Sequence, residues 1–105
     1  MKKLNVNDLM EFTAERSNRK EIFKERQVDT GLLLYMPDQK TPEHKHSDID
    51  EIFYVVAGSG NLTINGEEFS LKEQDVIYSP VGESHGFHNT GNLNLIVLQI
   101  KLAVW

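Results

Sequence analysis

The chain has 105 residues, 39% hydrophobic and 26% charged, with a formal net charge of −5 and no cysteine. This length suits one domain, the lack of cysteine excludes disulfides and thiolate metal ligands, and the acidic balance argues against a nucleic-acid-binding face. The sequence also has no apolar run long enough to cross a membrane, and polar residues interrupt any signal-peptide segment near the N-terminus. We therefore expect a cytoplasmic protein that binds neither nucleic acid nor a membrane.

The chain begins with a segment, residues 1–19, that we expect to be an extension packed on the main domain. Residues 5–12 allow one short helical turn with Asn5 or Asn7 as its cap, and residues 13–19 have the composition of a loop. From about residue 20, short runs rich in Val, Ile, Leu, Phe and Tyr recur between turn residues. This pattern is typical of an all-β sandwich or barrel, which we assign to residues 20–105.

Turn residues separate the expected strands. Asn65-Gly66 is the strongest hairpin signal, because both central residues of the favoured turn need positive φ. Other turns are predicted at Asp29–Gly31, Gly58–Gly60, Lys72–Asp75 and Thr90–Asn92. The last strand, residues 93–102, is apolar at nearly every position, so both of its faces should be covered. A closed barrel or a two-sheet sandwich, with or without a partner subunit, meets that requirement.

The four histidines lie in two places along the chain. Side chains alternate along a strand, so His44 and His46 should point the same way, about 7 Å apart, and converge on one ion. Glu51 lies an odd number of positions further on, which predicts a bend or bulge within residues 47–50 that returns it to the same face. In the second place His85 shares a face with Phe87, and His88 faces the opposite side.

Both places resemble a known family. The segment HKHSDIDEIFYVVAG has the form H-x-H, four residues, E, six residues, G, and resembles the first signature of the cupin superfamily. The segment PVGESHGFHN has the form P-x-G, two residues, H, three residues, N, and resembles the second. Each signature usually opens with a glycine, where this chain has Asp38 and Gln74, both at expected turns. The resemblance implies a small single-domain cupin, an antiparallel jelly-roll β-barrel, with a metal ion held by His44, His46, Glu51 and His85.

The chemistry of this ligand set agrees with a metal site. Three neutral imidazoles and one carboxylate suit a first-row divalent ion, so we expect one Mn, Fe, Ni, Co or Zn per chain. Such a centre carries a formal charge of about +1 and attracts small anions. Four ligands leave two positions open on an octahedral ion but close the shell of a tetrahedral zinc. An apolar pocket wall is expected from Phe53, Val55, Ile77 and Phe87.

Two functions remain open at this stage. The resemblance implies either a metal-dependent enzyme of dioxygenase, decarboxylase or isomerase type, acting on a small oxygen-rich or acidic molecule, or a non-catalytic binding or sensor module with a metal in the barrel. A weaker alternative is a metal that only stiffens the barrel. No residue stands out as a general acid or base, so no catalytic residue is assigned, and the tyrosines are interpreted as packing residues.

We also expect a homodimer. Ile52, Tyr54 and Val56 alternate with the inward residues of their strand and would otherwise face solvent, and the chain ends on an apolar tail, residues 102–105. His88 is expected at the surface or at the dimer interface.

Overall fold

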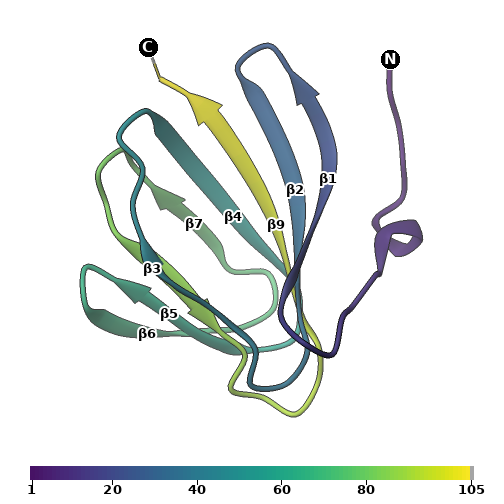
Figure 1. Cartoon of the computed structure of the whole chain (residues 1–105), viewed down its shortest axis with the longest axis vertical. Coiled ribbons are helices and arrows are strands. Elements are labelled where there is room, and N and C mark those ends of the chain that lie inside the picture. The colour runs from purple at the N-terminus through teal and green to yellow at the C-terminus, as the bar shows by residue number, and fades with distance from the viewer. Residues whose placement is uncertain (105) are drawn as a thin grey trace.

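The computed structural model of the protein describes residues 1–104 and consists almost entirely of strands (Figure 1). The predicted helical turn is a 3-10 turn, η1 (Val6–Leu9), capped by Asn5, whose side chain accepts a hydrogen bond from the Asn7 backbone at 2.9 Å. Trp105, at the end of the apolar tail, lies outside the described residues. Within residues 1–104 no helix has the length and apolar character that crossing a membrane requires. The strands are β1 (Asn18–Glu25), β2 (Val28–Tyr35), β3 (Lys40–His44), β4 (Ile49–Ala57), β5 (Gly60–Ile64), β6 (Glu67–Leu71), β7 (Val76–Ser79), β8 (His85–His88) and β9 (Leu95–Ala103).

These strands form two antiparallel sheets. The five-stranded sheet has the order β1-β2-β9-β4-β7, and the four-stranded sheet has the order β3-β8-β5-β6. Neighbours within a sheet are mostly distant in sequence, so the chain passes repeatedly from one sheet to the other. In Figure 1 the sheets converge toward the bottom of the view and separate toward the top, where β9 ends. The predicted all-β antiparallel barrel is confirmed.

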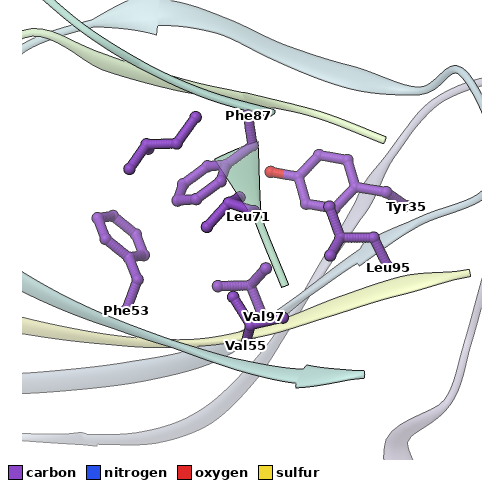
Figure 2. Close-up of a cluster of buried hydrophobic side chains, with 8 residues drawn as sticks. Tyr35, Phe53, Val55, Leu71, Phe87, Leu95 and Val97 are labelled. Carbon is purple, nitrogen blue, oxygen red and sulfur yellow. The ribbon is translucent and has the colours of Figure 1, made fainter. Parts of the chain in front are cut away.

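The core lies between the sheets and follows from the alternation of side chains along each strand. On β4, Glu51, Phe53 and Val55 are buried, while Ile52 and Tyr54 between them are only half-buried. The same alternation on β9 buries its inner face and leaves its outer face half-buried. The prediction that both faces of this strand are covered is therefore correct only for the inner face. Figure 2 shows the resulting cluster, Tyr35, Phe53, Val55, Leu62, Leu71, Phe87, Leu95 and Val97. Each of these large side chains contributes about 1.5–3 kcal/mol of burial free energy.

The turns agree with the sequence except at one place. Asn65 and Gly66 have φ of 47° and 81° and join β5 to β6, as predicted. The turn predicted at residues 29–31 is wrong: the chain reverses at Arg26-Gln27, with Arg26 at φ 53°, and residues 29–31 continue β2. Gly31 serves another purpose, since a Cβ there would lie 2.6 Å from guanidinium atoms of Arg19. The glycine makes room on the sheet for that side chain.

Asp38 and Gln74, which replace the usual signature glycines, both adopt left-handed backbone conformations, with φ of 69° and 73°. The backbone geometry that favours glycine is therefore kept although the glycines are absent. The loops before β3 and β7 keep their tight turns.

The N-terminal segment lies against the outer face of the five-stranded sheet. Leu4 and Val6 border an apolar hollow of about 240 Å³, together with side chains of β1 and β9. Strand β1 begins at Asn18, slightly earlier than the predicted boundary near residue 20. On this face Leu32 and Leu34 are fully buried although they do not belong to the inner cluster.

Candidate metal centre

Three histidines from different segments meet between the two sheets. His44 ends β3 and pairs in register with His85, which begins β8. His46 lies just past the end of β3, in the stretch with bends at residues 47 and 48, so the predicted phase change before Glu51 occurs in a loop rather than as a bulge in a strand. One ring nitrogen from each of the three histidines can be chosen so that all lie within 4.8 Å of one another. The residues that the sequence placed together are therefore together in space.

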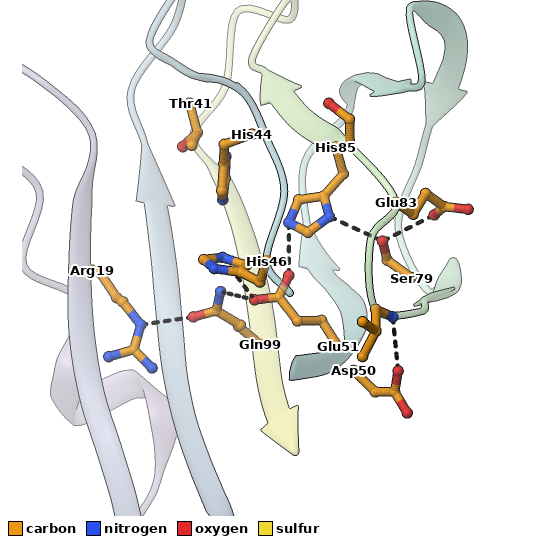
Figure 3. Close-up of polar contacts among 12 residues, drawn as sticks. Arg19, Thr41, His44, His46, Asp50, Glu51, Ser79, Glu83, His85 and Gln99 are labelled. Atoms are coloured by element: carbon orange, nitrogen blue, oxygen red, sulfur yellow. Dashed lines mark hydrogen bonds and ion pairs between the residues drawn. The ribbon is translucent and has the colours of Figure 1, made fainter. Parts of the chain in front are cut away.

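The centre runs from the interior to the rim of the barrel. His85 and Glu51 are buried, His46 is half-buried and His44 is exposed. Glu51 adjoins the histidines: its Oε2 lies 2.7 Å from Nε2 of His85, and its Oε1 lies 3.8 Å from Nε2 of His46. Figure 3 shows the three rings and the Glu51 carboxylate turned toward one another. A ligand at this centre can be reached from solvent on the His44 side.

Two of the rings are oriented by hydrogen bonds at Nδ1. His44 Nδ1 lies 2.9 Å from the carbonyl oxygen of Pro42, to which it donates. His85 Nδ1 lies 2.9 Å from Oγ of Ser79. A ring that is protonated at Nδ1 keeps the lone pair on Nε2, the arrangement that metal-binding histidines commonly show. Both rings therefore present Nε2 to the centre.

The closest contact in the buried part of the centre requires a proton or a metal ion. Glu51 Oε2 and His85 Nε2 are both buried and form an ion pair at 2.7 Å, and apart from each other neither atom has a hydrogen-bond partner within residues 1–104. Two acceptors this close repel each other unless a proton or a metal ion lies between or beside them. Three imidazole nitrogens and a carboxylate are suitable ligands for a divalent ion. The residues present thus fit a metal ion.

The surroundings also favour an ionised carboxylate at Glu51 and a neutral imidazole at His46. Burial alone would raise the pKa of Glu51, but contact with His85 and the nearby charges of His46 and Lys101 outweigh it, and the pKa is lowered overall. Burial lowers the pKa of His46, and the opposing attraction of Glu51 only partly offsets this. Deprotonated groups are the ones that bind metal.

A row of polar side chains is hydrogen-bonded to Glu51. It was not predicted from the sequence. Arg19 Nε donates to Gln99 Oε1 at 2.7 Å, and Gln99 Nε2 donates to Glu51 Oε1 at 3.5 Å (Figure 3). A second guanidinium nitrogen of Arg19 pairs with Asp29 at 3.1 Å. Two features could have indicated this row: a glycine within a strand, Gly31, and a glutamine at an inward position of an otherwise apolar strand.

The residues predicted to form a pocket wall lie beside or below the centre. The Phe53 ring centroid is 5.2 Å from that of His85 and 4.8 Å from that of Phe87. Val55 and Phe87 belong to the buried cluster, and Ile77 is partly buried against it. Their contact with a ligand stays a prediction. His88 points away from the centre, with Nε2 2.9 Å from Asp38.

Comparison with known proteins decides the family. A family model described as the cupin domain matches residues 31–101. The chain belongs to the cupin family. This cupin is 38% identical over 68 residues to the oxalate-binding protein of Thermotoga maritima, covering 65% of this chain and 56% of that protein. It is 41% identical over 59 residues to the uncharacterized protein MJ1618 of Methanocaldococcus jannaschii, covering 56% of this chain and 47% of that one.

The fold of the cupin is also that of solved structures. The protein TT1209 from Thermus thermophilus superposes with a TM-score of 0.92 over the whole of both chains, at 20% identity. The chain spans about half the length of the curated relatives it matches. Their names therefore bear on its function only as proposals.

Proposed function

We propose that this cupin is a metal-dependent enzyme, of dioxygenase, decarboxylase or isomerase type, that acts on a small acidic or oxygen-rich molecule. The observation that carries the proposal is the cluster of three histidines with a buried carboxylate, in which Glu51 Oε2 and His85 Nε2 lie 2.7 Å apart. His44, His46, Glu51 and His85 would hold one divalent ion. When bound, the ion supplies Lewis-acid or redox chemistry, according to its identity.

Cations on the inner wall support an anionic substrate. Lys101 on β9 is the register partner of Glu51, so both lie on the inner face, and Arg19 reaches the same face through Gln99. The charge of Lys101 helps to lower the pKa of Glu51, so its ammonium acts on the centre, and the ion pairs formed within residues 1–104 do not include it. The similarity to a protein named as oxalate-binding points to the same substrate class.

The chain's own residues would act in binding and in shielding. Lys101 would hold an acidic group by charge, while the exposed His44 side leaves a path for entry. The Phe53 ring packs against His85 and excludes water from the buried side of the centre, which strengthens electrostatic contacts there. Within residues 1–104 no further acid or base is assigned to proton transfer. The buried phenol of Tyr35 is unsuited to it, because burial raises its pKa to about 12 and it is bound to Thr41.

The first test is the metal content of protein prepared without chelator and without a histidine tag. We expect about one equivalent of a divalent transition metal in the wild type and a large loss in His85→Ala. His88→Ala is the matched control, since His88 binds Asp38 on the outside and its loss should leave the metal in place. Absence of metal from the wild type after incubation with divalent ions would refute the proposal.

The second test separates an enzyme from a binding or sensor module, the alternative function. The metal-loaded protein is incubated with small carboxylic acids, including oxalate, with and without oxygen, and the solution is followed by NMR. Consumption of an acid by the wild type but not by His85→Ala supports an enzyme. Saturable line broadening or shifts without consumption, weakened by Lys101→Met, favour the binding module. One equivalent of zinc with no response to any acid would leave only a structural metal.

A further inference from the structure

A chain of hydrogen bonds behind His85 has a direction, and this direction determines which ring nitrogen holds the proton. Ser79 Oγ lies 2.9 Å from Glu83 Oε1 and 2.9 Å from His85 Nδ1. A hydroxyl has one hydrogen, and a carboxylate can only accept. The Ser79 hydroxyl must therefore donate to Glu83, which leaves its oxygen lone pairs for His85. Nδ1 of His85 must then be the donor.

We propose that Ser79 and Glu83 are positioning residues that fix His85 in the Nδ1–H tautomer and so aim the lone pair of Nε2 at the metal. Neither side chain touches the centre itself; both act through the His85 ring. The proposal rests on the proposed function where it concerns metal affinity, but the proton on Nδ1 is held by Ser79 with or without metal.

The position of Ser79 in the fold supports this role. Ser79 is the last residue of β7 and the register partner of Glu51, so the two partners of the His85 ring come from adjacent strands. Ser79 and His85 are both buried, and water cannot easily replace the hydroxyl. Glu83 is half-buried, in the loop that connects β7 to β8. The short loop from Ser79 to His85 thus carries all three members of the chain (Figure 3).

The consequence concerns how well the centre is prepared for an ion. Without Ser79 the ring would have a buried Nδ1 with no partner and would be free to place its proton on Nε2, where it could bond to Glu51. That tautomer blocks the nitrogen that the metal needs. Loss of an outer partner of a metal-binding histidine typically weakens metal affinity roughly 10–100-fold.

The test uses Ser79→Ala, Glu83→Gln and the control Ser70→Ala, which removes an exposed hydroxyl on β6. The dissociation constant for Zn²⁺ is measured by competition with a chelating dye. We expect Ser79→Ala to bind roughly 10–100-fold more weakly than the wild type, and Ser70→Ala to bind as the wild type does. Glu83→Gln should show a smaller loss, because a carboxamide can donate to Ser79 and release the constraint. Glu83 is half-buried, so this variant avoids changing the core.

The second readout is the ring itself, since a merely structural role for Ser79 would not alter the tautomer. Long-range ¹H–¹⁵N correlation spectra at alkaline pH show which nitrogen of His85 holds the proton. We expect a proton on Nδ1 in the wild type, with and without Zn²⁺, and a ring protonated only at Nε2, or a mixture, in metal-free Ser79→Ala. A wild-type ring without a proton on Nδ1, or zinc affinity in Ser79→Ala equal to that of Ser70→Ala, would overturn the proposal. Should the wild type bind no metal, the proposed function fails, while the metal-free spectra still decide whether the positioning exists.

Discussion

Glu51 combines near-complete burial with a lowered pKa, and this combination ties the stability of the metal-free protein to pH. The carboxylate is kept ionised by His85, His46 and Lys101 against the effect of burial. A group whose pKa is lower in the folded state than in the unfolded state adds stability above its unfolded pKa and loses it as pH falls. His46 follows the same sign, because burial lowers its pKa too.

We therefore expect the metal-free protein to lose stability on acidification in two ranges. The first begins below 6.5, the ordinary pKa of histidine, and reflects His46. The second begins below 4.5, the ordinary value for glutamate, and reflects Glu51. Urea unfolding at a series of pH values measures both. In Glu51→Gln the fall in unfolding free energy below pH 4.5 should disappear. In Glu67→Gln, at an exposed position of β6, it should remain. Equal pH profiles for the wild type and Glu51→Gln would contradict this account.

Gln74 has a left-handed backbone, which costs a non-glycine residue roughly 1–2 kcal/mol. Its side chain is exposed, so replacement removes little packing. We expect Gln74→Gly to raise the free energy of unfolding by up to about 1 kcal/mol, since the relief is partly offset by the greater freedom of glycine in the unfolded chain. Gln74→Ala keeps the strain and should leave stability nearly unchanged. Thermal unfolding of the two variants tests this, and destabilisation by glycine would show that the turn is not strained.

Strand β2 contributes to the centre through a glycine, Gly31, which has no side chain. Gly31 leaves space for the guanidinium of Arg19 to pass over β2 and reach Gln99 on β9. Gln99 in turn donates to Glu51 on β4. One missing side chain thus lets Arg19 on the edge strand act on Glu51, three strands away in the sheet.

Gly31→Ala should therefore weaken metal binding while leaving the fold intact. The added methyl would meet the far end of the flexible Arg19 side chain, which can move aside, so the fold should persist at a cost of about 1–3 kcal/mol for the hydrogen bond that buried Gln99 loses. Displaced from Gln99, Arg19 would no longer orient Glu51, and we expect affinity for Zn²⁺ to fall about tenfold. Arg19→Met should give the same loss. Unchanged affinity in both variants would show that Glu51 needs no support from this row.

The sequence predicted the strands, the turn and the side-chain cluster for which the evidence is local. Asn65-Gly66 favoured a tight turn, and the spacing of His44, His46, Glu51 and His85 predicted that they lie together, although His46 lies in a loop. Long-range contacts were missed because no local sequence pattern indicates them. Arg19 and Gln99, for example, are 80 residues apart. Gly31 was misinterpreted as a turn for the same reason, since its neighbour Arg19 comes from another strand.

At the scale of the whole molecule, the outer face of the five-stranded sheet is apolar. Register pairs on this face join Ile52 to Ile100 and Tyr54 to Leu98, and Tyr54 also pairs with Val76. The N-terminal segment borders only the β1, β2 and β9 side of this face. Toward the β7 edge, Val76 and Tyr78 are 69% and 59% exposed. An apolar face of this kind on a small domain is typical of an association surface.

We accordingly predict a homodimer formed through this face, with light scattering at micromolar concentration giving the mass of two chains. Tyr54→Glu places a charge in the centre of the apolar face and should yield the mass of one chain, because burying an unpaired carboxylate at an interface is strongly unfavourable. Leu93→Glu is the matched control: Leu93 is 72% exposed in the loop before β9, away from this face, and its change should leave the dimer intact. A wild-type mass of one chain would refute the dimer. A dimer that persists in Tyr54→Glu would show that the interface lies on another face. Because Glu51 and His85 lie on the opposite side of the sheet, metal content should be equal in all three proteins.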